Sequence, residues 1–356
     1  MSIYWSKLTK SQVPYVPGEQ PKDKKYIKLN TNENPYPPSP KVLEAIKNTA
    51  NEDLRLYPDP ECTALRAVIA KYYNLSEEEV FVGNGSDEVL AFSFQTFFDP
   101  GRTILFPDIT YSFYPVYCKL YGLDYATVTL DKDFNIPLEG FLTENGGVVI
   151  SNPNAPTAKY MSLDKIKEIL EFNKNSVVII DEAYIDFGGE SSVSLIKDYP
   201  NLLVIQTLSK SRCLAGLRIG FALGNKELIK GLNMVKNSFN SYTIDRLALN
   251  GAIEALSDEE YFNETRQKII FTREKTTESL TEMGFTVTES KANFIFISHA
   301  EIKADIIFGR LREKGILVRY FNKTRIDNFL RVSIGTDTEM KAFIGALKEI
   351  LAENSL

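Results

Sequence analysis

The chain has 356 residues, of which 44% are hydrophobic and 25% charged, a composition typical of a soluble globular protein with more than one domain. Its net charge of −6 at pH 7 excludes the basic surface of a nucleic-acid-binding protein. No apolar core of a signal peptide and no membrane-spanning run is found, so we expect a cytoplasmic protein without a membrane partner. Three scattered cysteines and one histidine, His299, argue against disulfides, metal sites and Ser-His-Asp triads.

The first 30 residues are polar and interrupted by proline, which predicts an extended arm rather than a folded domain. Proline-rich loops follow around Asn34 and Tyr57, each ahead of a predicted helix. These helices are expected from about residue 41 and over 62–73.

From residue 80 onward, short apolar strands alternate with helices such as the one predicted over 163–172. The strands are expected over 80–82, 103–106, 148–151, 177–181 and 202–206. Apolar strands joined by helical crossovers imply an α/β fold with a mostly parallel central sheet covered by helices. A long helical region over 245–283 then leads into short strands and helices, which predict a smaller α+β domain. We expect an arm over 1–33, a large domain over 34–244 and a small C-terminal domain over 245–356.

Polar residues follow three of these strands in turn: Asn154, Asp181 and Lys210. They are 27 and 29 residues apart, close to one βαβ unit of roughly 30 residues. Parallel strands present their carboxyl ends at one edge of a sheet, where ligands bind in open α/β folds. Because Asp181 follows four apolar residues, its burial would require a partner, and a protonated pyridine nitrogen would be suitable.

The stretch from Thr207 to Gly220 joins two apolar runs and carries Lys210 among hydroxyl groups, with Arg218 eight residues later. Hydroxyls and a guanidinium favour a phosphate site. A lysine amine beside such a site can form a Schiff base with a phosphorylated aldehyde, such as pyridoxal phosphate. Taken alone, the stretch also fits a solvated polar loop.

A second candidate anion site is Gly83-Asn-Gly-Ser86-Asp87-Glu88, between a predicted strand and a helix start. Here we expect the Asp87 amide to bind the anion and its side chain to cap the helix. The alternative is the dinucleotide turn of a nicotinamide-dependent dehydrogenase, with Asp108 as the ribose acid, but Glu88 stands where that motif has a glycine. A Ser-x-x-Lys hydrolase is a further alternative, although this pattern recurs in the chain without a Lys-Thr-Gly partner.

Several short motifs occur together along nearly the whole length of the chain. They are Pro14-Tyr15-Val-Pro-Gly-Glu-Gln-Pro21, Asn32-Glu-Asn-Pro35, Tyr57-Pro58, Asn152-Pro-Asn154, Asp181-Glu-Ala-Tyr184, Ser209-Lys210, Gly216-Leu-Arg218-Ile-Gly220 and Leu330-Arg331-Val-Ser-Ile-Gly-Thr336. In this order they resemble the fold-type I pyridoxal-phosphate aminotransferases, most closely the histidinol-phosphate group. Cys213 departs from the pattern, because relatives usually have an aromatic or aliphatic residue there.

The resemblance implies a role for each matching residue. Lys210 would hold the cofactor as an aldimine and move the Cα proton, and Asp181 would keep the pyridine nitrogen protonated. Tyr184, the third catalytic residue implied, would hydrogen-bond the phenolic oxygen of the cofactor ring together with Asn154, and Tyr111 would stack on the ring. The residues implied to bind the cofactor phosphate are Ser86, Asp87, Thr207, Ser209, Arg218 and, from the partner subunit, Tyr57. Tyr111 and Tyr184 also fit simple packing roles.

Two arginines indicate the substrate, since Arg319 and Arg331 each lie on a predicted strand. A carboxylate needs one bidentate arginine, whereas a phosphate dianion is better served by two, although Arg319 also fits a surface position. With Tyr15 and Asn34 as further substrate residues, the resemblance implies a homodimer with shared active sites. Its arm would pack against the small domain and the partner, and it would convert L-histidinol phosphate and 2-oxoglutarate by ping-pong kinetics. The alternatives within this class are an aromatic or broad-specificity aminotransferase and a threonine-phosphate decarboxylase-like enzyme.

Overall fold

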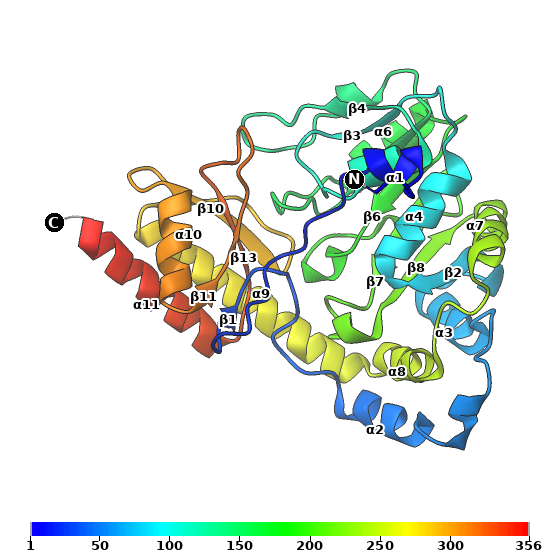
Figure 1. The fold of residues 1–356 in the computed structure, drawn as a ribbon, viewed down its shortest axis with the longest axis horizontal. Coiled ribbons are helices and arrows are strands. Elements are labelled where there is room, and N and C mark those ends of the chain that lie inside the picture. Colours follow the sequence, from blue (N-terminus) through cyan, green and yellow to red (C-terminus); the bar gives the residue numbers. More distant parts are fainter. Residues whose placement is uncertain (1, 355–356) are drawn as a thin grey trace.

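Seven strands form the main sheet in the computed structural model, which describes residues 2–354 (Figure 1). They lie in the order β2-β8-β7-β6-β5-β3-β4. Their bounds are β2 Val80–Asn84, β3 Ile104–Pro107, β4 Tyr125–Val128, β5 Gly147–Ser151, β6 Val178–Asp181, β7 Leu202–Thr207 and β8 Ile219–Gly224. Within this sheet β8 runs antiparallel to both neighbours, while the other paired strands are parallel. The carboxyl ends of β5, β6 and β7 therefore share one edge.

Helices cover both faces of this sheet. Its central strands β5, β6 and β7 are buried at every position, so both of their faces need a covering layer. Val148 and Ile150 belong to one core with α2 (Pro40–Thr49), α3 (Thr63–Tyr73), α6 (Leu163–Phe172) and α8 (Arg246–Ser257). Val149, between them, belongs to the opposite core with α4 (Gly85–Phe97), α5 (Tyr114–Tyr121) and α7 (Lys226–Phe239). This alternation of faces along one strand is the two-residue period of β-structure. The predicted fold class, α/β with a mostly parallel sheet, is confirmed.

A smaller sheet lies beside the first, in the order β12-β13-β10-β9. Its antiparallel strands are β9 Phe285–Val287, β10 Phe294–His299, β12 Arg319–Tyr320 and β13 Leu330–Ser333. The helices that accompany it are α9 Glu259–Glu282, α10 Ala304–Glu313 and α11 Asp337–Asn354. Figure 1 shows α9 running from α8 at the larger part of the molecule into this smaller part.

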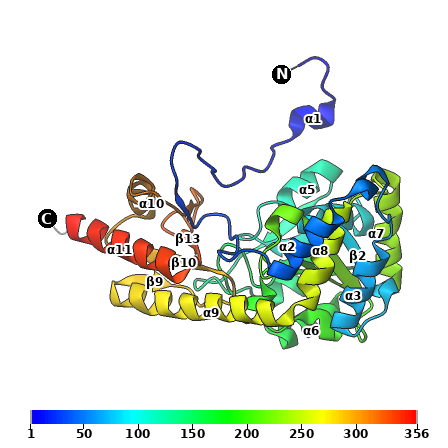
Figure 2. The same cartoon turned by 90° about the horizontal axis from the view of Figure 1, so that it is seen from below.

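The N-terminal segment connects to the smaller part through β1 (Ile27–Lys28), which pairs in parallel with β11 (Ile316–Leu317). Before β1 the chain is extended apart from the short helix α1 (Lys7–Ser11), which buries none of its residues. Figure 2 shows this dark-blue arm running outside the packed body of the molecule. Within residues 2–354 no helix has both the length and the apolar character that crossing a bilayer requires.

Two expected elements are divided in the structure. The helical region predicted over 245–283 breaks at Asp258, whose carboxylate accepts hydrogen bonds from Ser39 and Lys41 of the α2 region. Among the short strands expected in the smaller domain, residues 316–320 form two, β11 and β12, which belong to different sheets. The proposed domain limits stay a prediction, and α8 packs with α2 and α3 in the core of the larger part.

Candidate active site

A cavity of about 660 Å³ lies where the larger part, the smaller part and the arm meet. Ser151, Asp181 and Thr207, the last residues of β5, β6 and β7, line it, as expected for the carboxyl edge of a parallel sheet. The predicted site residues that the structure brings together there are Tyr15, Ser86, Asp87, Tyr111, Asp181, Tyr184, Thr207, Ser209, Lys210, Arg218, Arg319 and Arg331. The other three, Asn34, Tyr57 and Asn154, do not line the cavity.

Lys210 lies in a tight turn just after β7. The Thr207 hydroxyl accepts the Ser209 amide hydrogen at 3.1 Å, which closes the start of the turn. The Asn34 side-chain amide donates to the Lys210 carbonyl at 2.9 Å from the other side. The lysine amine is 3.5 Å from the Thr31 carbonyl and 5.7 Å from the centre of the Tyr184 ring. Asn34, expected among the substrate residues, instead holds the main chain of the lysine turn.

Asp181 ends β6 with its carboxylate buried at the base of the cavity. The Tyr114 hydroxyl donates to Oδ2 at 2.8 Å, and the Ala183 amide donates to Oδ1 at 3.3 Å. Burial raises the pKa of Asp181 from its ordinary 3.8 to about 6, and the hydrogen bond from Tyr114 partly opposes this rise. Within residues 2–354 no cationic side chain is hydrogen-bonded to this buried acid.

The raised pKa of Asp181 makes the stability of the cofactor-free chain depend on pH. Because the folded chain binds this proton more tightly than the unfolded chain, the stabilising contribution is complete below about pH 4. It is lost as the pH rises to about 6, a change of roughly 3 kcal/mol in the free energy of unfolding. A protonated ring nitrogen at the open side of the carboxylate would remove this cost, which fits a pyridinium ring.

The start of α4 forms a second polar corner of the cavity. Gly85 has a φ of +77°, and a Cβ atom there would lie 2.5 Å from Arg218 Nη2. The glycine therefore lets the guanidinium approach the first-turn amides of the helix, which have no intrahelical acceptors. With the hydroxyls of Ser86 and Ser209 lining the same cavity, this corner has the donors that a phosphate group requires.

The Asp87 side chain does not cap α4, contrary to expectation. Its carboxylate accepts the Tyr111 hydroxyl at 2.7 Å and Arg218 Nη2 at 3.3 Å. It is Glu88 that accepts the Asn84 amide hydrogen at the helix start. The Asp87 side chain was predicted to cap the helix because its charge would repel a bound anion, but that argument does not show which of the two neighbouring acids, Asp87 or Glu88, turns back to the helix start.

Three further residues were predicted to contact the cofactor: Tyr184, Asn154 and Tyr57. Tyr184 lines the cavity and accepts a hydrogen bond from Asn32 Nδ2 at 3.0 Å. Asn154 lies behind the wall, where its amide donates to Ile109 and Thr157, and Thr110 donates to its oxygen. Tyr57 is 77% exposed and does not line the cavity, and its ring stacks on Tyr242 with the ring centres 4.6 Å apart.

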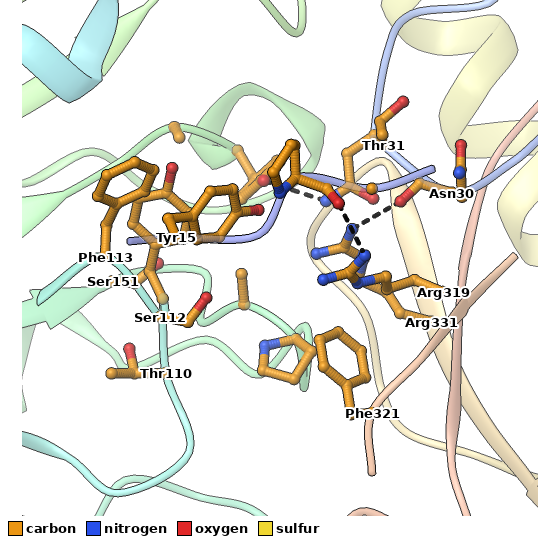
Figure 3. Close-up of a pocket in the computed structure, with 18 of the residues that line it drawn as sticks. Tyr15, Asn30, Thr31, Thr110, Ser112, Phe113, Ser151, Arg319, Phe321 and Arg331 are labelled. Atoms are coloured by element: carbon orange, nitrogen blue, oxygen red, sulfur yellow. Dashed lines mark hydrogen bonds between the residues drawn. The ribbon is translucent and has the colours of Figure 1, made fainter. Parts of the chain in front are cut away.

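Arg319 and Arg331 are direct cross-strand partners in the register of β12 and β13. Figure 3 shows their guanidinium groups side by side above Phe321. Within the described residues their hydrogen bonds go to main-chain carbonyls, those of Asn30 for Arg331 and of Val16 and Pro17 for Arg319. Burial lowers the pKa of Arg331, and the charge of Arg319 adds to this effect. Like charges placed opposite on a sheet repel each other, so the pair is suited to an anionic ligand.

Two unsatisfied groups lie beside these arginines. Among the residues that the structure describes, neither Arg331 Nε nor Asn30 Oδ1 has a hydrogen-bond partner, and both atoms are buried in residues that line the cavity. The amide nitrogen of Asn30 is already donated to the Glu19 carbonyl at 2.9 Å. Buried polar groups are rarely left unpaired, so a ligand or water at this position would complete the site.

Sequence reasoning missed a group of residues that hold the site together. Tyr114 binds Asp181, and Asn32 binds Tyr184. Asp108, considered as a ribose acid, instead accepts Arg325 Nη1 at 2.8 Å across the rim of the cavity. The position of Asp108 at a strand end was visible in the sequence, but its partner is 217 residues away and no local spacing indicates it.

Known proteins are similar to this chain over almost its entire length. The family "Aminotransferase class I and II" matches residues 24–347. Histidinol-phosphate aminotransferase from Clostridium botulinum is 67% identical over 351 residues, covering 99% of each chain. Its namesake from Clostridium acetobutylicum is 64% identical over 352 residues, covering 99% of this chain and all of the other. The crystal structure of histidinol-phosphate aminotransferase from Sinorhizobium meliloti in complex with pyridoxal-5'-phosphate is similar, with a TM-score of 0.90, 25% identity and 99% coverage of both chains.

Proposed function

The chain belongs to the class I and II aminotransferase family, and we propose that it transfers the amino group of L-histidinol phosphate to 2-oxoglutarate. The products are 3-(imidazol-4-yl)-2-oxopropyl phosphate and L-glutamate, and the reaction belongs to histidine biosynthesis. The observation that carries the choice of substrate is the cross-strand pair of Arg319 and Arg331, which faces the cavity without a carboxylate bonded to it. A phosphate dianion can engage both guanidinium groups, whereas a single carboxylate is satisfied by one.

Pyridoxal phosphate is the cofactor that fits the polar groups of the cavity. Lys210 would attach it, Asp181 would hold a proton on its ring nitrogen, and the α4 corner with Arg218 would bind its phosphate. When bound, this cofactor supplies an electron sink for negative charge that develops at the substrate Cα. The buried acid without a bonded cation and the glycine-lined phosphate corner support the assignment independently of each other.

The protein side chains have separate tasks in the reaction. Lys210 Nζ moves the proton at the substrate Cα, and its turn is held by Asn34 and Thr207 so that the amine stays in the cavity. Arg319 and Arg331 together bind the phosphate of histidinol phosphate, and Arg331 also binds the carboxylate of 2-oxoglutarate. Because one cavity takes both substrates in turn, the first product must leave before the second substrate enters, which gives ping-pong kinetics.

Aromatic amino acids are the second candidate class of amino donor. The rings of Tyr15 and Phe113 stack at 4.4 Å in the wall of the cavity, and Phe321 lines the arginine side. Such rings accommodate an imidazole and a phenyl group by similar contacts. The arginine pair is therefore the feature that separates the two candidates, because an amino acid carries a carboxylate and no phosphate.

Replacing Arg319 with glutamine tests this choice directly. We expect kcat/KM for histidinol phosphate to fall at least about tenfold, because one charge-assisted contact to the phosphate is lost. The value for phenylalanine as donor should change less than about threefold, since Arg331 alone serves the carboxylate. Arg310→Gln is the matched control, because Arg310 lies on α10 and pairs with Glu353. An equal loss with both donors, or a loss with neither, would contradict the assignment of histidinol phosphate.

We propose further that the enzyme is a cytoplasmic homodimer in which Tyr57 serves the site of the partner. Tyr57 is exposed, and so are the apolar side chains of Leu54, Leu56, Met234 and Phe239. Tyr57 does not line the cavity of its own chain, and the exposed arm offers a second surface for a partner. A self-complementary interface of this kind is usual for a two-fold dimer.

Subunit mixing tests the shared site. Lys210→Ala chains and Tyr57→Ala chains should each have little activity. A hybrid dimer has one site free of both changes, so an equal mixture should recover about a quarter of the wild-type activity. A mixture with no more activity than its parents would show that each chain completes its own site, and size-exclusion chromatography with light scattering verifies that dimers are present.

A further inference from the structure

We infer that Tyr114 is a positioning residue for the reaction, because its hydroxyl fixes both the orientation and the ionised state of the Asp181 carboxylate. This inference rests on the proposed function, in which Asp181 faces the ring nitrogen of the cofactor. Tyr114 is the first residue of α5 and is completely buried. Its hydroxyl lies 2.8 Å from Asp181 Oδ2, on the protein side of the carboxylate, and it does not line the cavity.

The phenol ring of Tyr114 is held on several sides. Ring centres of Phe94, Phe106 and Tyr111 lie 6.1, 5.8 and 5.7 Å away, the first nearly parallel and the others edge to face. A ring packed in this way cannot swing its hydroxyl away from β6 without disturbing the core under α4 and α5. The hydroxyl is therefore presented to Asp181 at a fixed position before any ligand binds.

Tyr114 supplies the shorter of the two hydrogen bonds to the carboxylate. The other, from the Ala183 amide to Oδ1, is 3.3 Å long and lies near the upper limit for such bonds. Without the phenol, a buried carboxylate would keep only this weak contact, and both its rotation and its charge would be less well determined. Asp181 is therefore not sufficient by itself to hold the cofactor ring in a fixed position. It also requires the hydroxyl that Tyr114, at the start of α5, donates to it.

The Tyr114 hydroxyl also lowers the pKa of Asp181. Burial and the nearby charge of Asp87 favour the protonated acid, whereas Tyr114, the Ala183 amide and the charge of Lys210 favour the carboxylate. The pKa of Tyr114 is raised well above its usual range by burial and by Asp181, so the phenol remains a donor at physiological pH. Removing the hydroxyl should raise the pKa of Asp181 further, and a neutral acid cannot pair with a protonated ring nitrogen.

The Tyr114→Phe enzyme tests this inference, since phenylalanine retains the ring packing. We expect the cofactor dissociation constant to rise about tenfold and kcat to fall more than KM changes. In the cofactor-free chain, the pH dependence of urea unfolding should place the pKa of Asp181 roughly one unit higher. Tyr73→Phe is the matched control, because its hydroxyl binds Gln206 Oε1 outside this cavity, and it should leave the cofactor affinity unchanged.

A double substitution separates positioning from packing. In an Asp181→Ala background the phenol has no carboxylate to orient, so adding Tyr114→Phe should change cofactor affinity less than about twofold. An undiminished effect in that background, or unchanged cofactor affinity in the single variant, would overturn the inference. Cofactor binding and unfolding do not depend on the amino donor. Failure of the wild type to use histidinol phosphate would therefore refute the proposed substrate and leave the role of Tyr114 standing.

Discussion

The Lys210→Ala enzyme is expected to lose at least about 10⁴-fold in turnover while remaining folded. No other lysine amine has the position of Lys210, in a turn fixed by Asn34 and Thr207 at the carboxyl edge of the sheet. In the proposed function, loss of the amine removes both the attachment point of the cofactor and the group that moves the Cα proton. Borohydride reduction followed by peptide mapping should locate the cofactor on Lys210 in the wild type and find no adduct in the variant.

A second lysine of the cavity gives the matched control. Lys323 also lines the cavity but is exposed, and Lys323→Ala should keep both the borohydride-stable adduct and most of the activity. Circular dichroism and thermal unfolding establish that Lys210→Ala retains its fold. A reducible adduct in the Lys210→Ala protein would place the cofactor attachment at another residue and refute the assignment.

The Arg331→Gln enzyme should lose roughly 30-fold to several thousand-fold in kcat/KM for histidinol phosphate, equivalent to about 2–5 kcal/mol. Glutamine can neither carry the charge nor form the two parallel bonds of a guanidinium. The loss should extend to 2-oxoglutarate, because the same cavity binds its carboxylate in the second half of the reaction. Initial rates with each substrate varied in turn measure both values, and this shared loss distinguishes Arg331 from Arg319.

The conservative variant Arg331→Lys refines this prediction. A lysine keeps the positive charge but loses the planar fork, so its kcat/KM should lie between those of the glutamine variant and the wild type. The unfolding midpoint of the glutamine variant should be unchanged or higher, since it removes the repulsion between Arg319 and Arg331, whereas the lysine variant keeps the charge and should unfold near the wild-type midpoint. Wild-type kinetics with 2-oxoglutarate in Arg331→Gln would show that the carboxylate binds elsewhere.

The sequence predicted the position of a site residue where that position depends only on the strand or helix next to it. Asp181 and Lys210 were found because each follows an apolar strand, and parallel strands bring such positions to one edge. The position of Ser86 at the cavity was predicted because a glycine-rich turn precedes a helix start. In these cases the backbone alone determines where the side chain lies, so a spacing in the sequence is sufficient.

Prediction failed where the partner of a side chain is set by tertiary packing. Asn34 was expected to contact substrate, but its amide turns to the Lys210 carbonyl, a choice that depends on the path of a turn 176 residues away. The contact of Tyr114 was not predicted, because nothing in the neighbouring sequence indicates that its hydroxyl reaches Asp181. The strand β4 was missed because three of its four residues are exposed, which removes the apolar signal of a buried strand.

The pairing of β1 with β11 has a consequence for biosynthesis of the chain. Residue 27 leaves the ribosome 289 residues before residue 316, its partner in the ladder. At about 5–20 residues per second, translation leaves this strand without its mate for roughly 15–60 seconds. Arg319 and Arg331 emerge later still, so the large sheet can fold around Lys210 before the substrate-binding wall has been made. The Lys210 turn and the α4 corner can therefore form in the nascent chain well before the arginine pair, which we propose distinguishes one amino donor from another.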